Sequence, residues 1–149
     1  MSYVIRRAMQ GDQGAITSIV RDAEINPFGL HWPRFLVAEE DNRIIGVVQV
    51  KPHYDGSREL ASLAVIPERR GQGVGRALVE AILAGQAGPV YLTCADRLVG
   101  YYARFGFRSL EPAEMPAYFP RLSRLTRALG AILGAFHRHW RILVMARPA

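Results

Sequence analysis

The sequence has a single cysteine, a single lysine and no long apolar run. With Cys94 alone, the 149 residues can form neither an internal disulfide nor an all-cysteine metal site. The four histidines are scattered without metal-ligand spacing, so we expect no metal. No apolar run reaches the ~18–20 residues that span a bilayer, and the first residues lack a signal-peptide core. These absences predict a soluble, cytoplasmic protein.

Acidic residues are missing from the last 35 positions. Residues 1–114 hold 13 basic and 13 acidic side chains, whereas residues 115–149 hold six arginines and no acid, so the formal net charge of +6 arises there. Lys51 is the only lysine among the 19 basic residues. A basic C-terminal segment attracts anions, and cofactor phosphates, nucleic acid or an acidic lipid surface are the candidate partners.

The composition predicts one folded domain. Half of the residues are hydrophobic and 21% are charged, which excludes intrinsic disorder. The length of 149 residues is typical of a single domain, and the chain contains no repeat, low-complexity tract or linker. We therefore expect residues 1–149 to form one domain.

The hydrophobic pattern changes character at Pro67. Before it, apolar runs at hairpin spacing predict strands at residues 3–8, 34–40, 43–51 and 58–66, and Asp12 is expected to cap a helix. After it, helices at about 74–84, 98–105 and 121–137 alternate with strands at 89–94, 107–110 and 139–146. This order predicts an α/β (α+β) fold whose mixed, mostly antiparallel central sheet carries helices on both faces.

Three alternating glycines, Gly71, Gly73 and Gly75, open the helix predicted after Pro67, and arginines flank them. Without Cβ atoms they let an anion approach the backbone, and the first-turn N–H groups and the helix dipole attract it. The turn therefore predicts a pyrophosphate site. No Gly-Lys-Ser/Thr follows, which excludes a P-loop, and the glycine spacing excludes a dinucleotide fingerprint. A tight strand–helix turn without a ligand is the remaining alternative.

Two motifs connect this turn to a known family. The segment Arg70-Gly71-Gln72-Gly73-Val74-Gly75 resembles the Arg/Gln-x-x-Gly-x-Gly/Ala signature of the GNAT superfamily of acetyl-CoA-dependent N-acetyltransferases. Residues 63–67 resemble its fourth strand, and residues 101–107 resemble its Φ-Tyr-x-x-Φ-Gly-Phe motif. The order of elements fits nearly the whole chain, except at about 110–137. The resemblance implies a single GNAT-like domain that uses acetyl-CoA as co-substrate.

The resemblance also implies which residues bind the cofactor. In this family the pantetheine arm lies like an extra strand between the fourth and fifth strands, so the backbone of Leu63, Ala64 and Val65 would pair with it. The pyrophosphate would bind to Arg70, Gly71, Gln72, Gly73, Val74, Gly75 and Arg76. For Arg76, a solvated basic patch is an alternative. Many members also carry an asparagine that contacts the cofactor arm, on the loop before the family's conserved tyrosine. In this sequence that position is Ala95.

Acetyl transfer to an amine requires a proton for the departing thiolate and a base for the amine. Tyr102 occupies the family's general-acid position, and tyrosine keeps its proton at neutral pH because its ordinary pKa is ~10. A core aromatic is the alternative. Glu59 lies four residues before Leu63, where some members carry the base. The alternative for Glu59 is a surface carboxylate paired with Arg58 or Arg108.

The acceptor is expected to enter near residues 26–33 and 112–120, where aromatic side chains line a pocket or belong to the core: Phe28, His31, Trp32, Tyr118 and Phe119.

The helix at 121–137 has a leucine face and an arginine face. We expect it to pack on this chain's sheet or in a homodimer, with membrane docking as the alternative. Nucleic-acid binding is disfavoured because no aromatic platform accompanies the arginines.

The sequence thus predicts an N-acetyltransferase that moves an acetyl group from acetyl-CoA to a primary amine of a small molecule or amino acid, by direct attack in a ternary complex. Two alternatives are a protein or peptide amine acetyltransferase and a non-catalytic acetyl-CoA-binding sensor or interaction module.

Overall fold

The computed structural model describes residues 2–121 and 142–149. The chain divides into two compact units, of which the first comprises Met1–Lys51 and Leu60–Ala87 and the second comprises Pro52–Glu59 and Gly88–Ala149. In the described part of the chain, no helix is long and apolar enough to cross a membrane. The helix expected at about 121–137 lies outside the described residues, except for its first residue.

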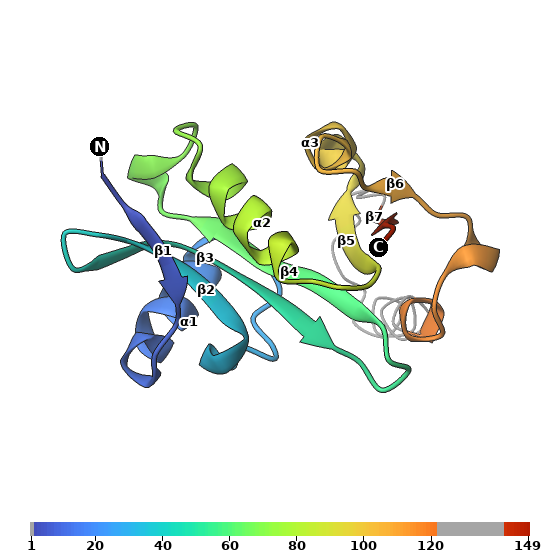
Figure 1. Ribbon diagram of the computed structural model, residues 1–149, viewed down its shortest axis with the longest axis horizontal. Helices are drawn as coiled ribbons and strands as arrows, with labels where there is room; N and C mark the ends of the chain where they lie inside the picture. Colours follow the sequence, from blue (N-terminus) through green and yellow to red (C-terminus); the bar gives the residue numbers. More distant parts are fainter. Residues whose placement is uncertain (1, 122–141) are drawn as a thin grey trace, which may run out of the picture. The chain divides into compact units, whose positions relative to one another are not determined.

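The elements follow the predicted order (Figure 1). In chain order, the strands and α-helices are β1 (Val4–Arg7), α1 (Gln13–Asp22), β2 (Phe35–Glu40), β3 (Arg43–Pro52), β4 (Arg58–Val65), α2 (Val74–Ala84), β5 (Val90–Ala95), α3 (Val99–Ala103), β6 (Arg108–Ser109) and β7 (Ile142–Arg147). Short 3₁₀ turns lie at Gln10–Asp12, Trp32–Arg34, Pro67–Arg69, Asp96–Leu98 and Pro112–Glu114. Residues 118–121 are helical.

The strands form a seven-stranded sheet in the order β1-β2-β3-β4-β5-β7-β6. Strands β1/β2, β2/β3, β5/β7 and β6/β7 pair antiparallel, and β4/β5 pair in parallel at Glu59↔Tyr91. The expected mixed, mostly antiparallel sheet of an α/β fold is therefore confirmed. Asp41 and Asn42, with φ of 49° and 61°, make the tight turn between β2 and β3.

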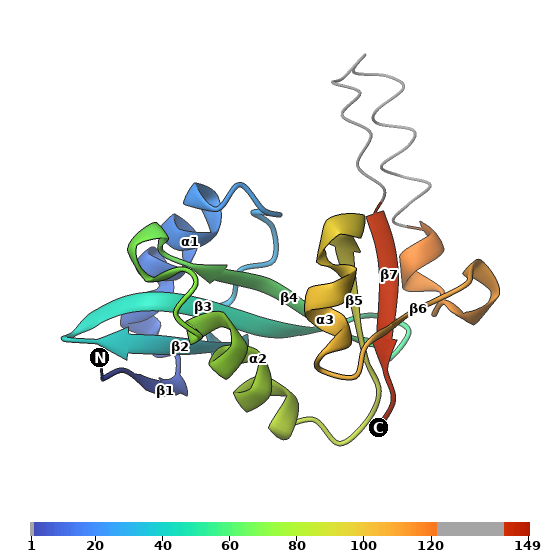
Figure 2. The same ribbon diagram turned by 90° about the horizontal axis from the view of Figure 1, so that it is seen from above.

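In the first unit, consecutive residues of β3 face opposite helices because strand side chains alternate. A Cβ added to Gly46 would meet Val74 and Leu78 of α2. The next residue, Val47, belongs to the buried cluster that contains Ile16 and Val20 of α1. Figure 2 shows the two helices on opposite sides of the strands, so in this unit both faces of the sheet are covered.

One detail of the sequence prediction is wrong, and one helix is shorter than expected. Asp12 precedes α1 but its side chain makes no capping hydrogen bond. Its carboxylate accepts from the Met9 N–H at 2.7 Å and pairs with Arg6 at 2.7 Å, because a guanidinium on the neighbouring strand is a stronger partner than a helix amide. The helix expected at 98–105 is present as the shorter α3, which follows the 3₁₀ turn Asp96–Leu98.

Candidate active site

The glycine-rich turn adopts the conformation that its sequence requires. Gly71 and Gly73 have φ of +72° and +85°, a left-handed region that other residues enter with strain, and Gly73 is the N-cap residue of α2. A Cβ built on either glycine meets no atom of the described chain within 4 Å. The backbone at the start of α2 is therefore open on the side of these glycines, as an anion site at a helix N-terminus requires.

The arginines beside the turn have partners within the chain. Arg69 pairs with Glu40 at 2.8 Å, and Arg76 pairs with Glu80 at 2.9 Å one helical turn later. Arg70 is exposed, and its Nε donates to the Val65 carbonyl at 3.0 Å. An exposed i,i+4 pair contributes only ~0.3–0.5 kcal/mol, so Arg76 can leave Glu80 for a phosphate at little cost.

These residues fit the pyrophosphate of a CoA molecule. Its two phosphates need N–H donors and a positive field, and the turn supplies the amides of residues 71–76 together with the N-terminus of the 11-residue α2. The upstream strand segment is less open. Ala64 is buried, and the Val65 carbonyl, a candidate for pairing with the pantetheine arm, accepts from Arg70.

Glu59 is a buried carboxylate in the second unit. It is 7% exposed and lies opposite Tyr91 at the start of β4. Its Oε1 lies 3.0 Å from Nε2 of His53. Arg108 pairs with Glu114 instead. The alternative of a surface carboxylate is therefore wrong.

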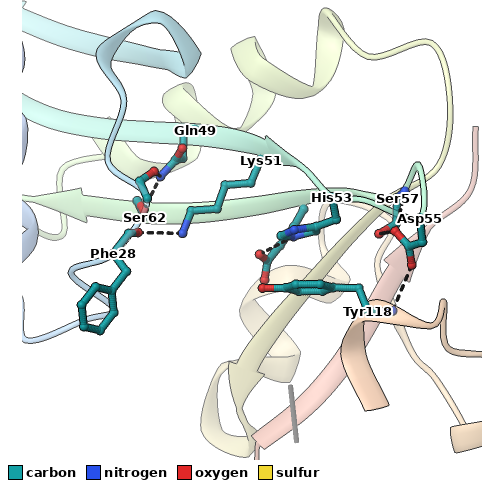
Figure 3. A network of polar contacts seen from close by, with 10 residues as sticks. Phe28, Gln49, Lys51, His53, Asp55, Ser57, Ser62 and Tyr118 are labelled. Atoms are coloured by element: carbon teal, nitrogen blue, oxygen red, sulfur yellow. Dashed lines mark hydrogen bonds and ion pairs between the residues drawn. The ribbon is translucent and has the colours of Figure 1, made fainter. Parts of the chain in front are cut away.

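His53 is a residue that the sequence reasoning missed, because residues 52–57 indicated only a turn. Its ring stacks on Tyr118, with the centroids 3.5 Å apart and an interplanar angle of 12°. The Phe119 ring meets it edge-on at 6.2 Å. Figure 3 shows the Tyr118 ring lying flat against the imidazole. The only sequence signal was a histidine six residues before a glutamate across a turn between two predicted strands.

Asp55 holds this arrangement together. One carboxylate oxygen accepts from the backbone N–H and the hydroxyl of Ser57, at 2.9 and 2.6 Å. The other accepts from the Tyr118 N–H at 3.0 Å (Figure 3). Hydrogen bonds from the Ser57 side chain, and then from its backbone, lower the pKa of Asp55 to about 2. The turn between β3 and β4 is thereby tied to the start of the helical residues 118–121.

Tyr102 lies on α3 within an aromatic group. Its ring is edge-on to Tyr101 at 5.1 Å and to Phe107 at 6.1 Å. Burial raises the pKa of Tyr102, and neighbouring Tyr101 and Cys94 raise it further. The hydroxyl therefore carries its proton at every physiological pH, as a general acid must. Among the described residues, no hydrogen bond joins Tyr102 to Glu59.

The predicted acceptor residues occupy different environments. Phe28 is 76% exposed and His31 is also exposed, whereas Phe119 is 2% exposed and is a core residue. Trp32 and Tyr118 are half-buried.

Two polar residues of β3 attach to the loop that carries Phe28. Lys51 Nζ donates to the Phe28 carbonyl at 2.9 Å, and Gln49 Nε2 donates to the Gly29 carbonyl at 3.3 Å and to Ser62 Oγ at 2.8 Å (Figure 3). Gln49 is fully buried, and its Oε1 has no hydrogen-bond partner in the described structure. This loop is thus held to the sheet by side chains that the sequence did not single out.

A family model decides what this fold is. The model described as an acetyltransferase (GNAT) domain matches residues 31–109, more than half of the chain. The chain belongs to the GNAT acetyltransferase family. The matched range includes the glycine-rich turn, Glu59 and Tyr102, so the resemblance stated from two motifs is confirmed.

Relatives of this GNAT domain include two mycothiol acetyltransferases. That of Nocardia farcinica is 38% identical over 79 residues, 51% of this chain and 26% of that protein. That of Rhodococcus opacus is 34% identical over 84 residues, 56% of this chain and 28% of that protein. The chain thus spans about a quarter of the length of these curated relatives.

Solved structures share the GNAT fold over nearly the whole chain. N-acetylglutamate synthase from Neisseria gonorrhoeae, complexed with coenzyme A and N-acetyl-glutamate, matches with a TM-score of 0.78 at 19% identity, over 99% of this chain and 35% of that chain. Rv2747 from Mycobacterium tuberculosis, in complex with CoA and NLQ, matches with a TM-score of 0.71 at 23% identity, over 98% and 99%. At these identities the likeness shows the fold.

The candidate residues of the GNAT domain fall into two groups. Leu63–Val65 and residues 70–76 all belong to the first unit, and Glu59 and Tyr102 belong to the second. No group of three or more metal-ligating side chains occurs within residues 2–121 and 142–149.

Proposed function

We propose that this GNAT domain transfers an acetyl group from acetyl-CoA to a primary amine of a small molecule or an amino acid, by direct attack in a ternary complex. The observation that carries the proposal is the burial of Glu59 on β4, the strand whose later residues are our candidates for the pantetheine arm. The relatives support this acceptor class, because their names refer to mycothiol and N-acetylglutamate, which are small molecules.

The cofactor would be held by the first unit. Residues 70–76 would bind the pyrophosphate through backbone N–H groups, with Arg70 and Arg76 adding charge, and the backbone of Leu63, Ala64 and Val65 would hold the pantetheine arm. When bound, acetyl-CoA supplies an activated acetyl thioester. Structures of N-acetylglutamate synthase and Rv2747 contain CoA, which supports this assignment.

Glu59 and Tyr102 would move the two protons. Glu59 accepts a proton from the acceptor ammonium, so that the nitrogen lone pair can attack the acetyl carbon. Tyr102 gives its phenolic proton to the sulfur as the C–S bond breaks. The nitrogen bonded to the acetyl carbon then loses its second proton, which returns to the tyrosinate directly or through water, and Glu59 releases its proton to water. A thiol loses its proton near pH ~8.5, so the transfer from a buried tyrosine is uphill until the tyrosinate is reprotonated.

A covalent acyl-cysteine route is disfavoured by the position of the only cysteine. Cys94 is 7% exposed on β5 and its Sγ lies 3.7 Å from the Met145 sulfur. Burial, followed by the Asp96 charge, raises the pKa of its thiol. Because the thiolate is the nucleophile in such chemistry, this residue is poorly suited to carry the acetyl group.

The experiment is an acetyl-CoA-dependent thiol-release assay over amino acids, polyamines, arylamines and peptide N-termini, with the products identified by mass spectrometry. We expect turnover with a small-molecule amine, and we expect Glu59→Gln to lower kcat by about 10²-fold. The swap preserves shape and removes the proton-accepting charge. Turnover confined to peptides would indicate a protein acetyltransferase. CoA binding without thiol release for any amine would indicate a sensor module and refute the proposal.

A further inference from the structure

The Glu59 carboxylate has a dedicated donor. His53 Nε2 lies 3.0 Å from Glu59 Oε1, and both side chains are buried, with exposed fractions of 10% and 9%. A general base has to be ionised and can then only accept hydrogen bonds, so this role requires the hydrogen of the pair to be on Nε2. In the described structure, His53 is a hydrogen-bond partner of Glu59.

The histidine ring is itself held on several sides. Tyr118 covers one face at 3.5 Å, and Phe119 contacts it edge-on. Its own backbone N–H donates to the Ser57 carbonyl at 2.9 Å, which closes the turn between β3 and β4. Tyr118 is fixed in turn by Asp55, which accepts from its backbone N–H. The direction of the Nε2–H bond is therefore set by packing and backbone contacts, independently of Glu59.

A fixed donor on one oxygen is what a buried general base needs. A carboxylate that is removed from water without a donor loses several kcal/mol of solvation and tends to take up a proton, which would end its function as a base. In general, a hydrogen bond to one carboxylate oxygen favours the charged form and restricts rotation about the last side-chain bond. The Oε2 lone pairs then have a constant direction, which proton transfer at ~2.6–3.2 Å requires.

We propose that His53 is the positioning residue of the general base: it binds Glu59 through Oε1 so that Oε2 receives the proton of the acceptor amine. This rests on the proposed function, in which Glu59 is the base. His53 does not touch the substrate in this scheme. The aromatic contacts of Tyr118 and Phe119 serve to aim its ring.

The test separates the hydrogen bond from the ring stacking by two opposite substitutions. His53→Gln keeps an N–H donor near the position of Nε2 and loses the ring, whereas His53→Phe keeps the ring on Tyr118 and loses the donor. We expect the glutamine variant to retain kcat within about threefold, and the phenylalanine variant to lose at least about tenfold, with the KM for acetyl-CoA unchanged in both. A purely structural role of the ring predicts the reverse order.

A second matched pair covers the case in which His53→Phe fails to fold. Glutamine and asparagine are both amides, but the shorter asparagine places its nitrogen near the position of Nδ1 and cannot reach Glu59. We expect His53→Asn to be slow and His53→Gln to be active, although the two variants have equal melting temperatures. Equal rates for these two variants would overturn the positioning role.

A double-mutant cycle with Glu59→Gln links the inference to the base. If His53 acts through Glu59, His53→Phe/Glu59→Gln is no slower than Glu59→Gln alone, to within about twofold. If the double variant instead loses the product of the two single losses in kcat, the positioning role is overturned. A slow Glu59→Gln beside a His53→Phe enzyme with the wild-type rate would overturn His53 alone. A Glu59→Gln enzyme with the wild-type rate would overturn the proposed base and, with it, this role.

Discussion

Gly73→Asp is expected to weaken CoA binding while the fold persists. Gly73 is the N-cap residue of α2 with φ of +85°, and a Cβ there meets nothing within 4 Å in the described chain. Aspartate enters the left-handed region more readily than most residues and is a favourable N-cap, so strain and capping partly offset each other. The introduced carboxylate would project toward the proposed pyrophosphate site.

The size of the effect follows from Coulomb's law. Two unit charges about 4 Å apart repel by ~1 kcal/mol in water and by ~4 kcal/mol at an effective dielectric constant of ~20. Facing a pyrophosphate, one carboxylate should therefore weaken the affinity for CoA by about 5- to 1,000-fold. Most of this penalty is absent in Gly73→Asn, which has the same shape and backbone preference without the charge.

Titration calorimetry with CoA is the assay. Thermal melting of the three proteins is the control, and equal melting temperatures show that the substitutions leave the fold intact. We expect wild type to bind tightest, Gly73→Asn to bind somewhat more weakly, and Gly73→Asp to bind weakest, below the asparagine variant by the factor given above. The difference between the two variants should shrink at high salt, because screening weakens exposed charges. Equal affinities for the aspartate and asparagine variants would refute the phosphate assignment of this turn.

Three further predictions concern other parts of the chain. Tyr102→Phe should lower kcat about 10²-fold with little change in the KM for acetyl-CoA, measured by steady-state thiol release, because only the proton donor is removed; an unchanged kcat would return Tyr102 to a packing role. Asp55→Asn should melt at a lower temperature than wild type at pH 7. Folding lowers the pKa of Asp55 from 3.8 to about 2, so its stabilisation is complete above pH ~4 and is lost as the pH falls through about 2. The gap between the two melting temperatures should therefore shrink steadily below pH ~4, and a gap at pH 2 as large as at pH 7 would contradict this. Gly46→Ala should cost ~1–3 kcal/mol of unfolding free energy in urea titrations, since the new Cβ would lie 2.9 Å from Leu78 Cδ1; wild-type stability would show that α2 yields freely.

Local sequence was sufficient for most of the elements, including the helix that follows the glycine-rich turn. The helix predicted at 74–84 is α2, because its apolar positions repeat at helical spacing and glycines precede it. The strands before Pro67 also match to within a residue or two, since alternation and the Asp41-Asn42 turn are local signals. The left-handed φ of Gly71 and Gly73 is a finding of the structure, and glycine is the residue that adopts it without strain.

Contacts between distant residues decided the surroundings of the candidate base. Asp55 and Tyr118 are 63 positions apart. Neither residues 52–57 nor residues 112–120 show a sequence pattern that pairs them. The environment of Glu59 depends on this pairing, because Tyr118 stacks on the ring of His53, which contacts Glu59. Asp12 illustrates the same limit, since a capping residue was diverted by Arg6 on a neighbouring strand. Propensity and periodicity act within a few residues, whereas hydrogen bonds and ring stacking between separate segments exist only after the chain has folded.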